Sequence, residues 1–421
     1  MCQLESSHKR KFLFSYNWWL LTALIAGVIA GSLGLHPLHL VANAISEVVI
    51  RALKLISLPM LFLSIVATIS GMKNGGEVRR IGRGVLFYTL ITTGGAALLG
   101  LGLFQLIGPV GEMPISESGS PSRPLGSYWS ALLNLVPSNA VQAFLDNHVI
   151  GVMVMALTLG AAILTLQGSP RAVVTDLFAG LFGAILKITR WLIAIMPLGV
   201  FAFVTLFTET LMQESWVKLN SFLLYLLCVV LANLIQAFFV LPALLKLKGI
   251  SPFQLGRAMA SALTLAFFTR SSNATLPVTI QCAEEKAKIS PRVSRFSLPL
   301  LATINMNGCA AFILITVLYV GGCHGIVFGP FEMLLMVVVA TLAAIGNAGV
   351  AMGCFFLSSA LLAAMNIPLT LMGMILPVYA FIDMLETSVN VWSDACVTAI
   401  VEKDLKRREA GVISIAVEPT P

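Results

Sequence analysis

Charged side chains are scarce in this sequence. Asp, Glu, Lys and Arg make up 11% of the 421 residues, whereas hydrophobic residues make up 58%. Soluble domains carry about 25% charged residues, so this composition excludes an ordinary soluble protein. No charged residue occurs between Glu332 and Asp383. We therefore expect an all-α integral membrane protein, with room for roughly eight to ten spans of about 20 residues each.

Several signatures of other protein classes are also missing. The seven cysteines are scattered singly and form no CxxC pair, so we interpret them as small apolar side chains rather than as a disulfide framework or a metal site. The chain has no GxxxxGK[ST] loop, which argues against ATP-driven transport, and no spacing typical of an enzyme site. The net charge of +7 comes from basic residues at the ends of apolar segments, which indicates membrane topology rather than binding to nucleic acid.

Apolar segments long enough to cross a membrane fill much of the chain. They lie at 17–35, 43–70, 84–110, 128–167, 173–208, 219–246, 293–320 and 369–402. Between the last three of these, two further apolar stretches are interrupted. Residues 258–268 and 275–283 are separated by TRSSNA, and residues 333–349 and 353–365 are separated by small residues. Each half is too short to cross about 30 Å of hydrocarbon as a helix. These stretches therefore predict re-entrant helical hairpins at 252–290 and 330–366.

Basic residues are distributed unevenly between the loops. If the N-terminus is cytoplasmic, the loops left outside (109–126, 209–218 and 321–330) hold only Arg123 and Lys218. The positive-inside rule is then satisfied, provided that both interrupted stretches enter and leave on the same side. The charge distribution thus supports the two hairpins and predicts that both termini are cytoplasmic. A broken segment followed by a full helix, twice, indicates an internal repeat with a binding site near the membrane midplane.

The last segment carries a polar stripe. Asp383, Glu386 with Thr387, Asn390 and Asp394 follow helical spacing and so lie on one face. A charge at the bilayer centre costs about 2.5–3.5 kcal/mol, so this face must point to a polar interior. One interpretation is a helix packed by buried ion pairs. The other, which we favour, is coordination of substrate and of an alkali cation by hard oxygen ligands.

Two other polar groups interrupt apolar segments. Asn305-Met306-Asn307-Gly308 lies within 293–320 and can expose backbone carbonyls to a cation, or can simply form a kink. Ser271, Ser272 and Asn273 can cap the second half-helix of the first hairpin, where free N–H groups attract a carboxylate. Arg270 is either a counter-charge for the acidic stripe or a snorkelling arginine.

Several motifs resemble those of one known family. TRSSNATLPVTI, ATINMNGC, AGVAMG and DMLETSVNVWSDACVTAIVEK are similar to motifs of the dicarboxylate/amino-acid:cation symporters, the glutamate-transporter family. The resemblance covers nearly the whole chain. It implies the elevator-type fold of that family, with eight transmembrane helices, two re-entrant hairpins and inverted repeats. It also implies a homotrimer of independent protomers in the plasma (inner) membrane.

The resemblance further implies a division of labour along the chain. A fixed scaffold would comprise helices 1–2 and 4–5, and a mobile transport domain would comprise the other helices and both hairpins. The second hairpin would act as the external gate. The corresponding ranges are a cytoplasmic N-terminus 1–16, scaffold 17–70, transport helix 84–110, external linker 111–127, scaffold 128–208, transport core 219–404 and cytoplasmic tail 405–421.

Site residues follow from the same motifs. Asp383 matches the aspartate that binds the substrate α-amine, and Asn390 the asparagine near the α-carboxylate. The complete substrate set implied is Ser271, Ser272, Asn273, Val350, Gly353, Asp383, Glu386, Thr387 and Asn390, with Arg270 compensating charge. The cation ligands implied are Ala302, Asn305, Asn390 and Asp394 for one Na⁺ site, Thr303, Met306 and Ala344 to Asn347 for a second, and Thr92 and Thr93 with Asn305 for part of a third.

The sequence departs from the family pattern in the site. An aspartate and a tyrosine of the third Na⁺ site are replaced by Asn307 and Thr89, so fewer ions are expected to be coupled. The gate motif is bulkier and less rich in glycine, at Val350-Ala351-Met352-Gly353-Cys354. Elsewhere an aspartate is replaced by Tyr379 and a threonine by Cys309.

Glu386 is the largest departure. Members that carry acidic substrates have an arginine there, and a glutamate would repel an acidic side chain. We therefore expect a Na⁺-coupled symporter for a neutral or cationic amino acid, or a related dicarboxylate, with no cofactor beyond the coupling ion. Alternatives are an H⁺-coupled glutamate/dicarboxylate symporter in which Glu386 is protonated, a Glu386 that only pairs with Arg270, and a channel-like protein with an anion leak.

Overall fold

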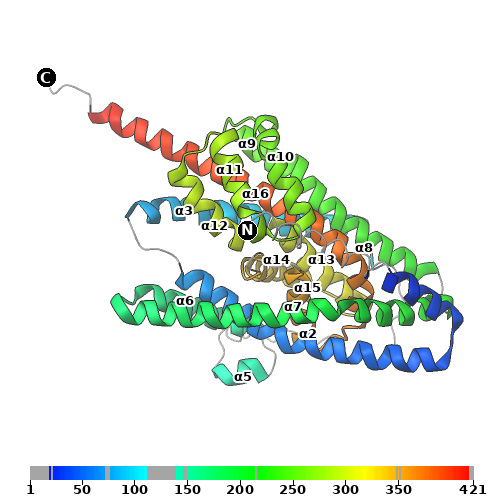
Figure 1. Ribbon diagram of the computed structural model, residues 1–421. Coiled ribbons are helices and arrows are strands. Elements are labelled where there is room, and N and C mark those ends of the chain that lie inside the picture. Colours follow the sequence, from blue (N-terminus) through cyan, green and yellow to red (C-terminus); the bar gives the residue numbers. More distant parts are fainter. Residues whose placement is uncertain are drawn as a thin grey trace, which may run out of the picture.

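A computed structural model describes residues 19, 22–71, 76–110, 139–145, 149–213, 216–347, 349 and 352–416. Every regular element within these ranges is a helix (Figure 1), which confirms the predicted all-α fold. The predicted N-terminal segment 1–16, the linker 111–127 and the gate residue Val350 lie outside the described residues.

One group of helices contains α2 (His36–Ser70), α6 (Val149–Thr165) and α7 (Gly168–Gln213), with the short α5 (Ala140–Leu145) beside α6. Helix α2 packs along both α6 and α7. The preceding helix, Thr22–Leu33, approaches α7 closely because it carries glycine at the contact: a Cβ at Gly27 would lie 2.8 Å from Cβ of Val204. Large apolar side chains point outward from this group, among them Leu55 and Trp191, as expected for a surface that faces lipid.

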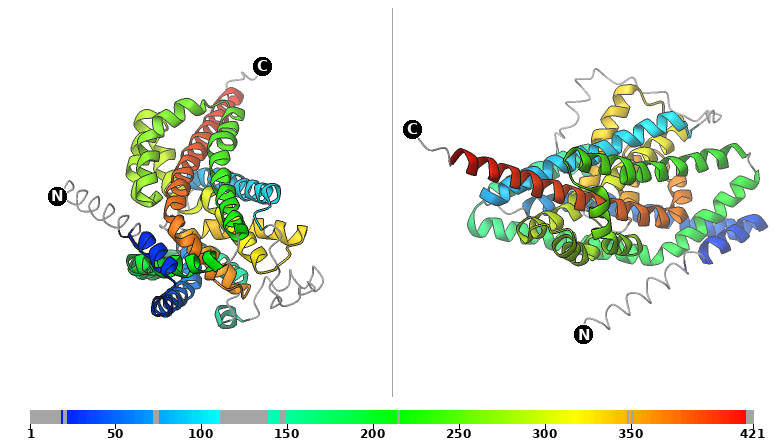
Figure 2. Two further views of the ribbon diagram at one scale, coloured as in Figure 1. Left: turned by 90° about the vertical axis from the view of Figure 1, so that its right-hand side faces the viewer. Right: turned by 90° about the horizontal axis from the view of Figure 1, so that it is seen from above.

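The other helices form a second group around α13 (Figures 1 and 2). Helix α13 packs against α3, α8, α14, α15 and α16, and every residue from Asn307 to Gly321 is buried. It is therefore the core of this group. The members are α3 (Gly76–Ile107), α8 (Trp216–Ile235), η1 (Gln236–Val240), α9 (Leu241–Leu247), α10 (Pro252–Thr269), α11 (Ser272–Gln281), η2 (Cys282–Lys286), α12 (Pro291–Ile304), α13 (Asn307–Cys323), α14 (Pro330–Ile345), α15 (Gly353–Ala364) and α16 (Thr370–Ala416).

Among the described residues, five helical stretches are long and apolar enough to cross a membrane. They are Ile81–Ile107, Gly168–Thr189, Leu219–Leu247, Pro291–Cys323 and Thr370–Arg407. Shorter apolar helices, such as Val154–Thr165, account for other predicted segments. The structure thus supports several spans, while the predicted total of eight remains a prediction.

Several helices are longer than the apolar segments that predicted them. Helix α3 begins at Gly76, α7 extends from Gly168 to Gln213, and α16 continues to Ala416. The added turns are polar, and pairs one turn apart stabilise them, such as Glu402 with Lys406 at 2.8 Å. Hydropathy marks where contact with lipid ends, whereas a helix continues as long as its backbone stays hydrogen-bonded.

Both interrupted stretches form pairs of short helices, as the sequence predicts. Helix α10 ends at Arg270, which has a left-handed backbone (φ 53°), and Ser271 caps the start of α11 by accepting a hydrogen bond from the amide of Ala274. Helices α10 and α11 pack against each other. In the second pair, α14 ends at Ile345 and α15 begins at Gly353.

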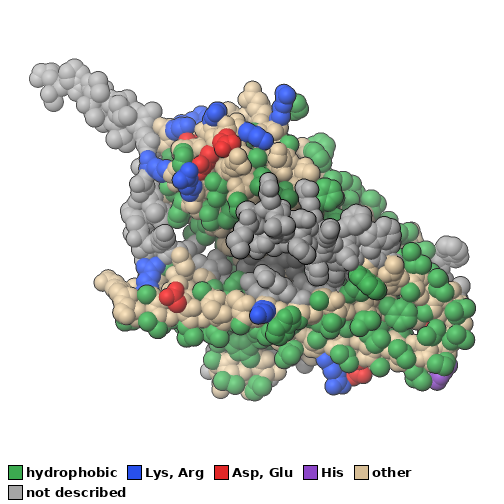
Figure 3. All heavy atoms as spheres, in the orientation of Figure 1, with side chains coloured by type: hydrophobic (Ala, Val, Ile, Leu, Met, Phe, Trp, Pro, Cys, Tyr) green, Lys and Arg blue, Asp and Glu red, His purple; other side chains and the backbone are tan. Residues whose placement is uncertain are grey.

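Basic side chains gather near one end of the second group, toward the top of Figure 3. There Lys248 pairs with Asp404, and Arg295 of α12 pairs with Glu284 at 2.9 Å. The hydrogen bonds from Arg295 and Ser294 lower the pKa of Glu284 to about 2, so its carboxylate stays charged across the physiological range. This ion pair fixes the end of the α10–α11 pair to α12.

The contact between α16 and α7 requires a glycine at position 373. A Cβ there would overlap the ring of Phe203, which is buried. We expect Gly373→Val to destabilise the protein by about 1–3 kcal/mol through overpacking. Thermal unfolding of the purified protein measures this. Gly180→Val is the control, because no atom lies near that position on α7; equal melting temperatures for the two variants would contradict the packing.

Candidate substrate and cation site

The site begins with a break between α12 and α13. Asn305 (φ −100°, ψ 70°) and Met306 (φ −104°, ψ 70°) depart from helical geometry and separate the two helices. Because the helical backbone stops at Ile304, the carbonyls of the last turn of α12 have no partner in a following turn. Ala302 and Thr303 belong to that turn, so their carbonyl oxygens are available to a ligand. The break falls where the Asn-rich motif predicts it.

The two asparagines of the motif join three helices. The side-chain amide of Asn305 donates to Oγ of Ser393 at 2.9 Å and to Oδ1 of Asp394 at 3.0 Å, both on α16. Its Oδ1 accepts from the hydroxyl of Thr92 on α3 at 3.0 Å and from Asn307 at 3.0 Å. The hydroxyl of Thr93 is also 3.5 Å from this oxygen. The structure therefore brings together the predicted Asn305, Asp394, Thr92 and Thr93.

Two members of this cluster were not predicted. Gln236 donates to Oδ1 of Asn307 at 2.7 Å and to the carbonyl of Thr92 at 3.2 Å, and Ser393 accepts from both asparagines. Gln236 opens the π-helical segment η1, which precedes Pro242, a residue without an N–H to donate. Gln236 and Asn233 are polar residues in the middle of the apolar segment 219–246, and this is the signal that could have identified Gln236.

Asp394 is the most isolated charge in the cluster. It is buried, and its carboxylate accepts a hydrogen bond from the side-chain amide of Asn305. Within the described residues, no cationic side chain pairs with it. A buried carboxylate without a counter-charge is very unfavourable. The surrounding carboxylate, amide, hydroxyl and carbonyl oxygens are the ligands that a hard cation prefers.

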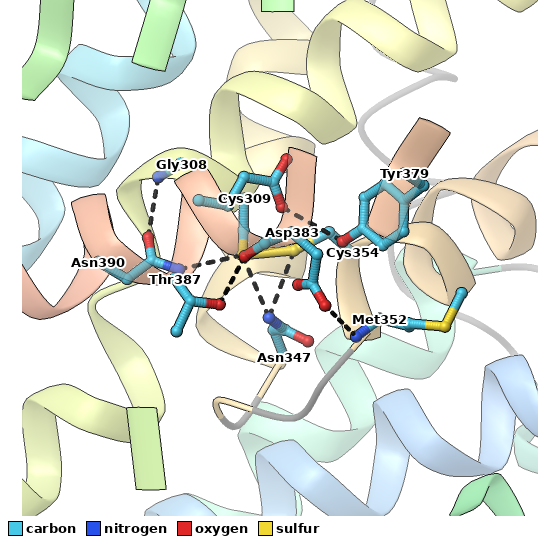
Figure 4. The surroundings of a disulfide bond; sticks show 10 residues. Gly308, Cys309, Asn347, Met352, Cys354, Tyr379, Asp383, Thr387 and Asn390 are labelled. Atoms are coloured by element: carbon cyan, nitrogen blue, oxygen red, sulfur yellow. Dashed lines mark hydrogen bonds between the residues drawn. A yellow bond between two sulfur atoms is a disulfide. The ribbon is translucent and has the colours of Figure 1, made fainter. Parts of the chain in front are cut away.

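Asp383, Thr387 and Asn390 of the stripe on α16 lie close to Gly308 and Met352 (Figure 4). Asn390 accepts a hydrogen bond from the amide of Gly308 at 2.9 Å. Gly308 allows this approach because a Cβ there would lie 2.9 Å from Cα of Glu386. Asp383 accepts from the amide of Met352, at the start of α15, at 3.2 Å. The hydroxyl of Thr387 instead donates to the carbonyl of Asp383 in its own helix at 2.7 Å.

Glu386 is fully buried and only partly satisfied. Its Oε2 accepts from the hydroxyl of Tyr379, two helical turns earlier on α16, at 3.2 Å. Its Oε1 has no hydrogen-bond partner within the described residues. Arg270 is also buried, and it interacts electrostatically with Asp383. The structure therefore shows Glu386 beside Tyr379 and Arg270 near Asp383.

The tips of the two broken stretches meet near the end of α12. Gly349 has a left-handed backbone (φ 64°), and a Cβ there would overlap the carbonyl oxygen of Ala302. The same Cβ would lie 3.2 Å from Nδ2 of Asn273 and 3.3 Å from Cε of Met306. Predicted residues from both tips and from the α12–α13 break are thus within contact distance.

The remaining predicted residues lie around this centre. Ser271 caps α11, and Ser272 is the first residue of that helix. The hydroxyl of Thr303 donates a hydrogen bond to the carbonyl of Leu300 in its own turn of α12, at 2.6 Å. Ala344 and Asn347 are buried at the end of α14, and Oδ1 of Asn347 has no partner within the described residues. Gly353, the first residue of α15, lies against Asn347. A Cβ at position 353 would overlap Oδ1 of Asn347, so this contact requires glycine.

The interpretation of the cysteines as unpaired apolar side chains is wrong for two of them. Cys309 at the start of α13 and Cys354 at the start of α15 form a disulfide, with Cα atoms 5.5 Å apart. The residues are separated by 45 positions in the sequence, so no local spacing could reveal the pair. Among the other described cysteines, Cys228, Cys282, Cys323 and Cys396 are in no disulfide. Both sulfurs lie within 4.8 Å of a Glu386 oxygen, but bonded sulfurs are not thiolates and so do not ligate a metal.

The sequence matches the family model described as the sodium:dicarboxylate symporter family over residues 17–404. It is 27% identical over 477 residues to excitatory amino acid transporter 3 of Mus musculus, covering 97% of this chain and 89% of the relative. It is also 27% identical over 435 residues to neutral amino acid transporter B(0) of Oryctolagus cuniculus, covering 92% of this chain and 80% of the relative.

We expect Gln236→Met to weaken the polar cluster. The substitution leaves two buried acceptors without this donor, at a cost of about 1–3 kcal/mol. The melting temperature of the purified protein should fall, and its increase on adding Na⁺ should shrink. Gln254→Met is the matched control, because Gln254 is exposed at the start of α10. If the two variants have equal melting temperatures at every Na⁺ concentration, Gln236 does not stabilise the cluster.

Proposed function

Because the chain belongs to the sodium:dicarboxylate symporter family, which comprises transporters rather than enzymes, we propose that it couples inward movement of Na⁺ to uptake of an amino acid across the plasma membrane. It is a multi-pass membrane protein, and its apolar helices agree with this. The relatives named above are called excitatory and neutral amino acid transporters, so the family contains more than one substrate class.

The observation that carries the proposal is the buried, uncompensated carboxylate of Asp394. It accepts a hydrogen bond from the amide of Asn305, and Asn305 is also hydrogen-bonded to the hydroxyls of Thr92 and Ser393. A Na⁺ ion bound there would neutralise the carboxylate and would use the free carbonyls at the end of α12. Binding of Na⁺ would then be linked to closure of the site, because Ala302 also touches the tip at Gly349.

The substrate would bind between the two tips and α16. Asp383 is placed to receive the α-amine, and its present partners are the amide of Met352 and Arg270. The start of α11, capped by Ser271, and the side chain of Asn390 would receive the α-carboxylate. Since Met352 lies directly before α15 and donates to Asp383, binding of a substrate amine at Asp383 would also depend on the position of the second tip.

The third Na⁺ site of the family is expected to be weak. Asn307 occupies the position of a carboxylate, and both ends of its amide are already used, by Gln236 on one side and by Asn305 and Ser393 on the other. A neutral, satisfied amide attracts a cation much less than a carboxylate does. We therefore propose that fewer Na⁺ ions are coupled per substrate than in members with an aspartate there.

Glu386 would face the side chain of the substrate. Its unpaired Oε1 is available to donors, which favours a neutral polar or cationic side chain over an acidic one. The same free oxygen also supports a second candidate, in which Glu386 carries the coupled proton of an H⁺-driven symporter.

The arrangement of helices supports an elevator mechanism. The group of α2, α6 and α7 would be the fixed scaffold, and the group around α13 would be the transport domain that moves past it. The α14–α15 pair would be the external gate, and the whole protein would be a homotrimer with both termini in the cytoplasm.

Asp394→Asn should raise the apparent Kd for Na⁺ by at least about 30-fold, because loss of a buried charge partner costs about 2–5 kcal/mol. Uptake into proteoliposomes should require Na⁺ and should stop when choline replaces it at fixed pH. Asp176→Asn, on an exposed part of α7, is the control and should behave like the unmodified chain. Sustained uptake in choline would instead establish the H⁺-driven alternative.

Glu386→Gln should shift selectivity toward acidic substrates by at least about tenfold, since it removes the repulsion of a like charge. The measurement is competition by the twenty amino acids and by C4 dicarboxylates, for the unmodified chain and for Glu386→Gln, at pH 8. Glu285→Gln, which alters an exposed glutamate, is the control. High-affinity uptake of aspartate or glutamate by the unmodified chain at this pH would refute the role given to Glu386.

A further inference from the structure

The disulfide lies inside the proposed site rather than at the surface. Cys309 is 3% exposed and Cys354 is 1% exposed. Nδ2 of Asn347 lies 3.2 Å from the sulfur of Cys309 and 3.4 Å from that of Cys354, and Nδ2 of Asn390 lies 3.3 Å from the sulfur of Cys309. Figure 4 shows the bond in the middle of these polar side chains. The cysteine pair is therefore enclosed by residues of the site.

The bond joins two parts that have different roles in the proposed function. Cys309 belongs to α13, the buried centre of its group, whereas Cys354 is the second residue of α15, next to the tip at Gly349–Met352. Of the described residues of the tip, Met352 donates a hydrogen bond from its amide to Asp383, and Gly349 lies against Ala302. Such contacts can break and re-form, but a covalent bond cannot follow an opening movement of α15 away from α13.

We propose that Cys309 and Cys354 are a reversible oxidation site that locks the α14–α15 pair closed over the substrate and cation site. The oxidised pair holds the protein occluded, and the reduced pair leaves the tip free to open. This proposal rests on the proposed function, because it takes α14–α15 to be the gate. An external gate also meets the oxidising side of the membrane, where disulfides persist.

The chemistry requires a disulfide reagent of low molecular mass, such as oxidised glutathione. The thiolate of Cys354 attacks one sulfur of the reagent RSSR, which forms a mixed disulfide and releases one thiol RSH. The thiolate of Cys309 then attacks the Cys354 sulfur, forms the internal bond and releases the second RSH. Each leaving group departs as RS⁻ and becomes RSH by taking up the proton that the attacking cysteine lost. Two protein thiols are oxidised and one reagent disulfide is reduced to two thiols, so atoms, protons and electrons balance.

Because both sulfurs are buried, the rates of oxidation and reduction depend on the position of the tip. When the gate is closed, both sulfurs are buried, so a reagent reaches them slowly; it reaches them readily when the tip is open, and the second step completes as the tip closes. Reduction runs through the same mixed disulfide in reverse and is expected to be slow in the occluded state, because attack requires access to a sulfur. Substrate or Na⁺ that shifts the tip toward closure should therefore slow both reactions.

The test uses the full chain, purified and reconstituted in liposomes, after treatment with oxidised glutathione or with a reducing agent. Peptide mapping identifies the cross-link between Cys309 and Cys354. Hydrogen exchange of the segment 346–353 reports opening of the tip without any substrate, and uptake reports transport. We expect oxidation to form the cross-link, to slow exchange of the tip, and to lower uptake at least about tenfold, because only uncross-linked molecules can open. The reducing agent should restore both readouts.

Three variants keep the test specific. Cys309→Ser and Cys354→Ser should lose the difference between oxidised and reduced samples, whereas Cys323→Ser, at the other end of α13, should retain it. A mapped cross-link with unchanged exchange and unchanged uptake would overturn the lock, as would failure of the oxidant to form the cross-link. If oxidation slows exchange of the tip but neither the oxidised nor the reduced protein takes up an amino acid, the result counts against the proposed function alone.

Discussion

Burial of charge without a counter-charge is the constraint on which the rest of this structure depends. Asp394 and Glu386 are surrounded by apolar helices, and no basic side chain within the described residues pairs with Asp394. A folded state with an empty, charged Asp394 is therefore costly. The protein reduces this cost with amide and hydroxyl partners, and a bound cation would remove most of it. A site that is unfavourable when empty is also a site whose shape responds to occupancy, which is what coupled transport requires.

The broken helices make backbone groups available in the candidate site. The interruption at Asn305–Met306 frees carbonyls on α12, and the turn at Arg270–Ser271 presents the start of α11. Such irregular backbone is tolerated at membrane depth only where other protein shelters it. Here α3, α13 and α16 provide the shelter, and Gln236 and Ser393 complete the hydrogen bonds of the motif. The residues that make the break costly are therefore the same residues that are proposed to bind the ion.

The second tip connects these elements. Met352 contacts Asp383, Gly349 contacts Ala302, and Cys354 is bonded to Cys309. In the proposed function, amine, cation and sulfur chemistry would all act on this part of the chain. A ligand that stabilises one of these contacts would then also favour the others, because Gly349, Met352 and Cys354 are close in sequence. This gives a physical reason for binding and closure to occur together.

The sequence by itself determined the class, the helical fold and the position of the breaks, because hydropathy and helix-breaking residues act locally. It also predicted a polar centre that contains Asp383, Asn390, Asp394 and Asn305, because polar residues are costly in an apolar segment, and their roles in binding stay a prediction. Only the tertiary structure revealed that Gln236 and Ser393 complete the cluster and that Tyr379 is the partner of Glu386. It also corrected the interpretation of Cys309 and Cys354. These facts depend on which helix faces come together across long stretches of chain, and no local pattern of residues encodes that juxtaposition.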